Sequence, residues 1–190
     1  PVYNEIESLK YLIDEIHFSL KNYNNYCILF IDDGSNDGST EFLKKSQKND
    51  VKINLIEFTI NKGKSAALNE GFKWVESDYV ITMDADLQDD PSEIPNLLKK
   101  LDDGYDLVSG WKKKRNDPLS KTLPSKLFNF TTSFLTGIKI HDFNCGLKAY
   151  KKTVIKSINV YGGLHRYIPV IAFKKGFKVD EFIVNHRPRK

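Results

Sequence analysis

The sequence is poor in cysteine and has no long apolar run. Only Cys27 and Cys145 are cysteines among 190 residues, and Cys27 lies in an apolar, strand-like run. We therefore expect a buried free thiol rather than a disulfide, as in proteins of reducing compartments. No apolar run approaches the ~20 residues that span a bilayer, and no segment has the pattern of a secretory signal peptide. The composition thus argues against a disulfide-stapled fold and against a membrane span within these residues.

Repeats, low-complexity segments and clear linkers are also missing, so we expect one domain, large enough for a sizeable core. The net charge is only +4, but basic residues gather at 112–115 and 186–190. Such clusters suit phosphates, nucleic acid or an anionic membrane surface, although a short lysine run is more often a solvated loop. Because the aromatic residues are not interleaved with the basic run, nucleic-acid binding is not expected.

Strand-like and helical patterns alternate through the first half of the chain, which predicts an α/β fold with a parallel sheet and right-handed crossovers. The expected elements there are helices over 6–21, 39–48, around 68–75 and over 93–102, and strands over 26–31, 53–58, 80–83 and 107–110. In the second half the patterns predict a basic loop over 112–126, helices over 127–135 and 164–175, and strands over 146–150 and 178–184.

Two carboxylates, Asp84 and Asp86, directly follow a short apolar strand in the spacing Asp-x-Asp. A helix start follows them, with Asp90 expected as its N-cap and Glu93 closing a capping box. The carboxyl edge of strands is where open α/β sheets bind ligands. Mg²⁺ commonly takes one or two carboxylates together with substrate phosphates. The stretch therefore predicts a metal–diphosphate site, and a solvated, acid-rich loop is the alternative.

Further polar groups are expected at the same edge. Asp32 or Asp33, after another strand, could accept hydrogen bonds from the imide of uracil or the edge of guanine, or could simply form an Asp-Gly turn. Lys64 stands at a helix start and favours an anion site. A P-loop is excluded because Phe58 occupies the position where that motif needs glycine.

The second half offers two further candidates. Asp142 is either a general base or a structural carboxylate that orients the acceptor loop. Arg166 follows Gly162-Gly163 and is placed to reach the site, where an arginine favours bidentate phosphate contacts. A plain surface arginine is the alternative, and His141 is interpreted as a surface or capping residue.

Five segments in one order closely resemble the family 2 glycosyltransferases, which adopt the GT-A nucleotide-diphospho-sugar transferase fold. The segments are Pro1-Val2-Tyr3-Asn4-Glu5, Asp32-Asp33-Gly34-Ser35, Asn61-Lys62-Gly63-Lys64, Asp84-Ala85-Asp86-Leu87-Gln88 and Asn144-Cys145-Gly146. The form of the fourth and fifth segments, with 165–167 and 186–189, resembles the polyprenyl-phosphate branch. That branch includes dolichol-phosphate mannose synthases and bacterial undecaprenyl-phosphate glucosyltransferases.

The resemblance, which covers nearly the whole chain, implies a single Rossmann-like α/β domain with a mostly parallel central sheet flanked by helices. Residues 1–110 would bind nucleotide sugar and metal, and 111–190 the acceptor. The implied nucleotide-binding residues are Pro1, Tyr3, Glu5, Asp32 or Asp33, Lys64, Asp84 and Ala85. The implied ligands of Mg²⁺ or Mn²⁺ are Asp84, Asp86 and Gln88. The implied catalytic residues are Asp86, Asp142 and Arg166, and the implied acceptor-phosphate residues are Lys112, Arg115, Lys121 and Ser125.

The chain departs from the family pattern in three places. Lys112 stands where the branch has an arginine, which keeps the charge but loses the bidentate fork. The apolar first strand that precedes the Pro-x-Tyr-Asn-Glu segment in the family is absent. Many members of the branch continue into membrane helices after the catalytic domain. We therefore expect a fragment of a longer protein, on the cytoplasmic face of the inner or plasma membrane, with basic patches toward the membrane surface.

The expected reaction is the inverting transfer of a hexose from a nucleotide-diphosphate sugar to a polyprenyl phosphate in cell-envelope glycan assembly. A lipid phosphate is already anionic and attacks unaided, whereas a sugar hydroxyl needs a base such as Asp142. The basic loop favours the lipid phosphate. The alternatives are a family 2 enzyme acting on a sugar hydroxyl in surface polysaccharide, a sugar nucleotidyltransferase, and a non-catalytic sugar-nucleotide or lipid-headgroup binding module. UDP-glucose is the first donor to try, and base, sugar and oligomeric state stay open.

Overall fold

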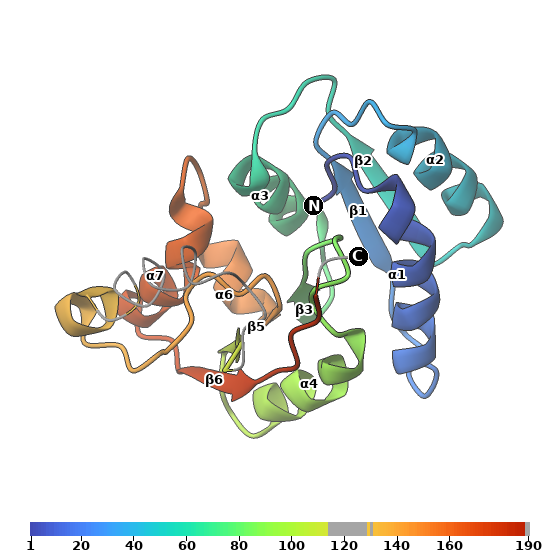
Figure 1. Ribbon diagram of the computed structural model, residues 1–190. Helices are drawn as coiled ribbons and strands as arrows, with labels where there is room; N and C mark the ends of the chain where they lie inside the picture. Colours follow the sequence, from blue (N-terminus) through green and yellow to red (C-terminus); the bar gives the residue numbers. More distant parts are fainter. Residues whose placement is uncertain (114–128, 130, 189–190) are drawn as a thin grey trace.

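The computed structural model describes residues 1–113, 129 and 131–188, and its elements follow the alternation in the sequence (Figure 1). The first half holds α1 (Ile6–Ser19), β1 (Ile28–Asp32), α2 (Ser39–Asn49), β2 (Ile53–Glu57), α3 (Lys64–Trp74), β3 (Tyr79–Thr82), the 3₁₀ turn η1 (Pro91–Glu93), α4 (Ile94–Asp102) and β4 (Leu107–Trp111). The second half holds β5 (Lys148–Lys151), α6 (Lys152–Ser157), the 3₁₀ turn η2 (Leu164–Tyr167), α7 (Ile168–Lys174) and β6 (Val179–Ile183). Residues 131–136 are also helical.

The strands pair in two groups. β1 and β2 are parallel, and the other four strands form a sheet in the order β3-β5-β4-β6. In that sheet β4 and β6 are parallel, whereas β5 is antiparallel to both β3 and β4. β3, β4 and β6 thus share one direction, and β1 and β2 are parallel to each other. This arrangement of parallel strands with helices confirms the predicted α/β fold class. The reversal of β5 was not predicted, because the second half of the chain lacks the regular strand–helix alternation from which a direction can be inferred.

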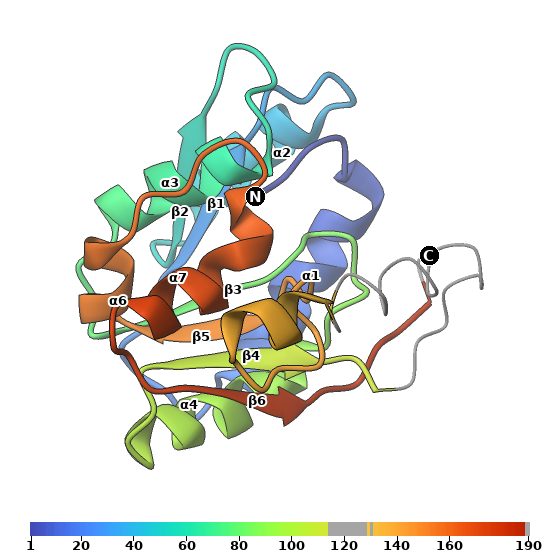
Figure 2. The same cartoon turned by 90° about the vertical axis from the view of Figure 1, so that its left-hand side faces the viewer.

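The four-stranded sheet is covered on both faces. Successive side chains of a strand point to opposite faces, and Leu107 and Val108 on β4 accordingly enter different clusters. Leu107 packs with apolar residues of α3, α6 and α7, and Val108 packs with Leu97 and Leu101 of α4. Figure 2 shows α4 on one side of the strands and α6 and α7 on the other. The layered arrangement leaves the strand ends as the place where polar side chains can gather.

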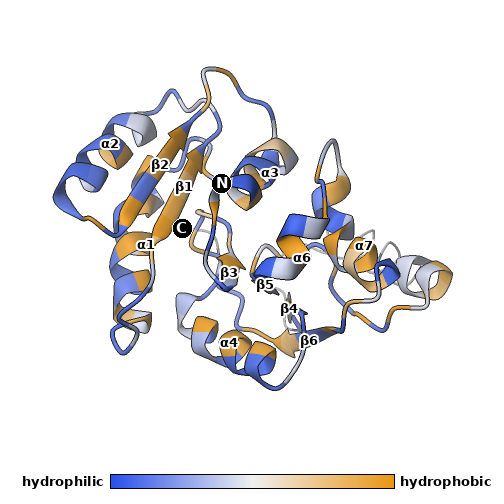
Figure 3. Cartoon of the chain, turned by 180° about the vertical axis from the view of Figure 1, so that it is seen from behind, coloured by the Kyte–Doolittle hydropathy of each residue, from blue (hydrophilic) through white to orange (hydrophobic). Residues whose placement is uncertain are grey.

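The N-terminal layer is built on α1, whose apolar residues recur at helical spacing. Leu9, Leu12, Ile13 and Ile16 are all buried and pack with residues of β1 and α2. β1 is apolar over most of its length (Figure 3). The first residues run beside it, since Val2 N donates to Ile31 O at 2.8 Å and Val2 O accepts from Asp33 N at 2.8 Å. This pairing carries the start of the chain to the same edge as Asp33.

Local details differ from the sequence-based expectations. Cys27 is exposed, not buried, because it precedes β1 instead of belonging to it, and Cys145 is the buried thiol. Asp90 caps the turn η1 through Ser92 N, as expected. Glu93, however, accepts from Asn96 Nδ2 and Asn185 N, so the capping box is replaced by a contact with the C-terminal segment.

The predicted helix over 127–135 and the loop over 112–126 lie partly outside the described residues. Within the described part of the chain, no helix combines the length and the apolar character that crossing a bilayer requires.

Candidate active site

The loop after β3 holds Asp84 and Asp86 in a tightly bonded turn. Asp84 N donates to Asp89 Oδ2 at 3.2 Å, and Gln88 N donates to Asp86 Oδ1 at 3.1 Å. Leu87 has a φ of +61°, a strained value for a side chain of this size. Its side chain is 3% exposed and packs in the cluster built on α1. Burial of this leucine therefore holds the loop after Asp86 in an unfavourable backbone conformation.

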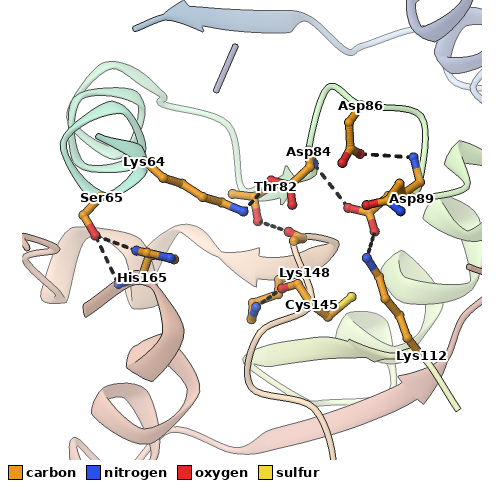
Figure 4. Close-up of polar contacts among 12 residues, drawn as sticks. Lys64, Ser65, Thr82, Asp84, Asp86, Asp89, Lys112, Cys145, Lys148 and His165 are labelled. Atoms are coloured by element: carbon orange, nitrogen blue, oxygen red, sulfur yellow. Dashed lines mark hydrogen bonds and ion pairs between the residues drawn. The ribbon is translucent and has the colours of Figure 1, made fainter. Parts of the chain in front are cut away.

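Asp84 forms an ion pair with Lys64, the first residue of α3 (Figure 4). Burial alone would raise the pKa of Asp84, but the Lys64 ammonium lowers it below its usual value. Gly146 gives the carboxylate its space, since a Cβ there would lie 2.6 Å from Asp84 Cγ. The sequence predicted Asp84 and Lys64 at this edge. The structure shows that Gly146, 62 positions after Asp84, is needed to make room for the Asp84 carboxylate.

Asp86 has different surroundings. Burial, then the nearby Asp84 and Asp89, raise the pKa of its carboxyl. It lines a cavity with the start of α1, where Glu5, Ser8 and Asp37 also contribute. The two acids of the Asp-x-Asp segment thus line two different cavities, Asp86 the one at the start of α1 and Asp84 the one beside Lys64.

Asp84 lines a second cavity that is rich in cations. Its wall includes Lys64, Lys148, His165 and Arg166, together with Pro1 and the loop 143–146. Lys148 is 4% exposed, its ammonium donates to Cys145 O, and burial lowers its pKa. Lys148 was not predicted from the sequence as part of the site. The available signal was a cation interrupting a strand-like run directly after the Cys-Gly segment.

Asp32 and Asp33 both have partners within the protein. Asp32 accepts from Ser35 Oγ at 2.5 Å and from Thr40 Oγ1, which ties the turn to α2. Asp33 accepts from Lys62 N at 2.7 Å and Gly63 N at 2.9 Å, which holds the turn before α3. The structure thus gives both carboxylates a role in shaping the edge, and contact with a nucleotide base stays a prediction.

The other predicted nucleotide-binding residues lie around this edge. Tyr3 is 48% exposed, Glu5 lines the cavity of Asp86, and the carbonyl of Ala85 accepts from Ser8 Oγ at 2.6 Å.

Lys112 forms a buried ion pair with Asp89. Its Nζ lies 2.8 Å from Asp89 Oδ1, and the exposed fractions of the two side chains are 12% and 0%. Burial lowers the pKa of Lys112, but Asp89 outweighs it and raises the pKa overall. The pair fastens the end of β4 to the Asp84 loop, so a role for Lys112 toward an acceptor phosphate stays a prediction. Arg115, Lys121 and Ser125 lie outside the described residues.

Asp142 is buried, with 1% exposure, and its Oδ1 accepts from Asn144 N at 3.1 Å. Its neighbours 143–146 line the cationic cavity, whereas Asp142 itself does not. Of the two interpretations of this residue, the contacts favour the structural one.

The basic C-terminal segment is also used inside the protein. His186 is 6% exposed and pairs with Asp89 in a short β-bridge. Arg187 contacts Asp90 through Nη2 at 2.7 Å and Glu15 of α1 through Nη1 at 2.5 Å. These two residues are therefore not available as a surface patch for anions.

A divalent cation at this edge would need oxygen ligands from the loop that holds Asp84 and Asp86. Within the described residues, no group of three or more His, Cys, Asp or Glu side chains is gathered for an ion. Two carboxylates on one loop, with raised pKa at Asp86, fit a hard cation that completes its shell with substrate phosphate and water. The residues therefore fit an ion that binds together with a diphosphate.

Solved structures place this fold among GT-A nucleotide-diphospho-sugar transferases. Glucosyl-3-phosphoglycerate synthase from Mycobacterium tuberculosis, in complex with Mn²⁺, UDP-glucose and phosphoglyceric acid, matches with a TM-score of 0.74 at 18% identity, over 100% of this chain and 70% of that chain. A mannosyltransferase from Pyrobaculum calidifontis, in complex with GDP-Man and Mn²⁺, matches with a TM-score of 0.70 at 18% identity, over 96% of this chain and 53% of that chain.

The chain belongs to glycosyl transferase family 2, whose model matches residues 1–158. An undecaprenyl-phosphate 4-deoxy-4-formamido-L-arabinose transferase from Pseudomonas syringae is 34% identical over 192 residues, covering 100% of this chain and 57% of the relative. A dodecaprenyl-phosphate galacturonate synthase from Rhizobium johnstonii is 31% identical over 196 residues, covering 100% of this chain and 58% of the relative. The chain thus spans less than two thirds of the length of these relatives.

Proposed function

We propose that this chain is the catalytic region of an inverting, metal-dependent transferase. It moves a hexose from a nucleotide-diphosphate sugar, with a UDP-sugar favoured, to a polyprenyl phosphate such as undecaprenyl phosphate. The observation that carries the proposal is the cationic cavity beside Asp84, in which Lys64, Lys148 and Arg166 converge from both halves of the chain. Such a gathering of cations suits a reaction whose donor and acceptor are both phosphorylated.

On the donor side, Asp84, Asp86 and Gln88 would hold Mg²⁺ or Mn²⁺, which would supply Lewis-acid stabilisation of the leaving diphosphate. Lys64 pairs with Asp84 and lies at the helix start beside it, where it can contact the same diphosphate. Arg166, on the cavity wall, supplies a further charge-assisted contact. The Mn²⁺ and nucleotide sugars named for the two solved structures support this assignment.

On the acceptor side, the names of the curated relatives support a polyprenyl phosphate. A phosphate acceptor attacks the anomeric carbon without a base, and the burial of Asp142 is consistent with this. The relatives carry different sugars in their names, so the sugar is a matter for experiment. The lipid acceptor places the reaction at a membrane, and we propose the cytoplasmic face of the inner or plasma membrane.

Transfer assays with the complete protein test this proposal. UDP-glucose, UDP-galactose, UDP-GlcNAc, UDP-galacturonate and GDP-mannose are each offered with Mn²⁺ or EDTA, with and without undecaprenyl phosphate. We expect lipid-dependent transfer that EDTA abolishes. Asp86→Asn should remove it, and the exposed Asp14→Asn is the matched control on α1. Nucleotide release that ignores the lipid would contradict the lipid acceptor, and binding without turnover by any donor would contradict an enzyme.

Asp142→Asn separates the lipid phosphate from the sugar-hydroxyl acceptor. If the acceptor is a lipid phosphate, the variant should keep transfer to within about tenfold, because no proton is removed from the acceptor. A loss of transfer activity of about 10²-fold or more, with the fold intact, would instead favour a hydroxyl acceptor.

A further inference from the structure

Two residues that lie 100 positions apart meet at the edge of the cationic cavity. Ser65, the second residue of α3, is 3% exposed. Its Oγ lies 2.9 Å from His165 Nδ1 and also accepts from His165 N at 3.2 Å. The turn η2, which carries His165 and Arg166, is thereby fastened to the helix that begins with Lys64.

The hydrogens of this contact can be assigned. A serine hydroxyl has one hydrogen to donate, and the backbone N–H of His165 already occupies a lone pair of Oγ. Among the described residues, Nδ1 is the other hydrogen-bond partner of Oγ. A proton on Nδ1 would leave the hydroxyl hydrogen buried without an acceptor, which is costly. Ser65 therefore donates to Nδ1, and the neutral imidazole carries its proton on Nε2.

The surroundings also keep the ring uncharged. Burial is the largest effect, followed by the cations Lys64, Arg166 and Lys148, and together they lower the pKa of His165 to about 4 despite the opposing Asp84. His165 is thus a neutral donor among charged ones near pH 7.

The Nε2 edge of the imidazole lies toward the cavity. His165 lines it together with Lys64, Asp84, Lys148 and Arg166. Figure 4 shows the ring extending from Ser65 toward the side on which Lys148 and Asp84 lie. No hydrogen bond of Nε2 to another described residue is formed, so its N–H is available to a ligand in the cavity.

We propose that His165 donates from Nε2 to a phosphoryl oxygen of the bound substrate, and that Ser65 positions it by fixing this tautomer. The proposal rests on the proposed function, which supplies the phosphorylated substrate. A neutral donor suits this place, because three cations already surround the cavity and a fourth would raise their mutual repulsion. The oxygen belongs either to the donor diphosphate or to the acceptor phosphate.

Isosteric substitutions of His165 give the first test. The amide of His165→Gln can place an N–H near the position of Nε2, whereas the amide of His165→Asn reaches only the position of Nδ1, and His165→Phe offers no donor. We expect kcat/KM of the Gln variant within about threefold of the parent, and a loss of about tenfold to hundredfold for Asn and Phe. A loss in the affinity for UDP identifies the donor diphosphate, and a loss confined to KM for undecaprenyl phosphate identifies the acceptor.

A spectroscopic test is independent of turnover. Long-range ¹H–¹⁵N correlation spectra distinguish the two tautomers of each of the four histidines. We expect His165 to carry its proton on Nε2 from pH 5.5 to 8, and Ser65→Ala to yield a mixture of tautomers with reduced UDP affinity. Binding of UDP with Mg²⁺ should shift the Nε2 resonance.

Three results would overturn the proposal: a proton on Nδ1, equal activity of the Gln and Asn variants, or an Nε2 resonance that ignores bound nucleotide and lipid phosphate alike. If the chain proved to transfer no sugar, the spectra and the UDP affinities of the variants would still decide the role of His165.

Discussion

At the scale of single residues, the site depends on close packing around Asp84. The ion pair with Lys64 orients one side of the carboxylate, and the missing side chain of Gly146 leaves room for the other. Since protein interiors are packed as densely as organic crystals, even one methyl group has a predictable effect there.

Gly146→Ala should displace Asp84, because the added Cβ would lie 2.6 Å from Asp84 Cγ. We expect kcat/KM for the nucleotide sugar to fall about tenfold or more, since small misplacements of a reacting group are costly. The control is Gly163→Ala, where a Cβ would meet nothing within 4 Å. A Gly146→Ala enzyme with unchanged kinetics would show that Asp84 is not held by this contact.

Lys112→Met should destabilise the protein by about 3 to 5 kcal/mol, because it leaves Asp89 charged and fully buried without its partner. Denaturant unfolding measures the loss, and Lys113→Met, at an exposed neighbour, is the control. The double variant with Asp89→Asn should recover part of the stability. Loss of lipid transfer without loss of stability would instead support the acceptor-phosphate role.

His165 should make the fold sensitive to mild acid. Its pKa is about 4 in the folded protein, against an ordinary value of 6.5. Between these values the unfolded chain binds more protons than the folded one, so stability falls as the pH drops from 6.5 toward 4. His165→Gln should show a smaller drop in thermal midpoint between pH 7 and pH 5. Parallel pH profiles of the two proteins would contradict the neutral histidine.

At the scale of elements, three segments meet at Arg187. It joins the C-terminal segment to Asp90, next to the loop 84–89, and to Glu15 on α1. The bridge between Asp89 and His186 lies beside it. The loop is therefore braced by a residue 97 positions away, which in turn contacts a helix 172 positions before it.

Arg187→Ala should loosen this loop more than it destabilises the fold. Arg187 is about a third exposed, so we expect a loss of only about 1 kcal/mol. Amide exchange should rise selectively over residues 84–90. The exchange rates of Arg187→Lys should lie between those of the parent and of Arg187→Ala, because lysine keeps the charge but lacks the bidentate guanidinium. An equal rise in amide exchange across the whole chain would show that Arg187 does not hold this loop in particular.

At the scale of the whole molecule, the cationic cavity is shared between the two halves of the chain. Lys64 and Asp84 come from the first half, and Lys148 and His165 from the second. A ligand that contacts both halves should stabilise the folded state as a unit.

UDP with Mn²⁺ should accordingly raise the thermal midpoint. At 100 times the dissociation constant, binding contributes about 2.7 kcal/mol, which corresponds to roughly 5 to 10 °C for a chain of this size. UDP with EDTA, or Asp86→Asn with Mn²⁺, should give a much smaller shift. Equal shifts with and without the metal would contradict a metal–diphosphate site.

The sequence by itself determined the elements of the first half and the Asp-x-Asp segment. Periodicity and turn residues are local properties, so α1, β1 and β3 could be predicted to within a few residues. The strand before Asp84 also fixed which sheet edge carries the carboxylates. Their packing around Leu87 and Gly146 was not predictable, because it depends on contacts between distant segments.

Only the tertiary structure decided which charged groups are free to meet a ligand. Lys112, His186 and Arg187 look alike in the sequence as parts of basic clusters, yet each is paired inside the fold. Lys148 and His165 have no distinctive sequence context, yet both line the cavity, Lys148 through a side chain that also donates to Cys145 O. The physical reason is that a charge is assigned its role by its three-dimensional neighbours and its exposure to water, and neither is encoded in local spacing.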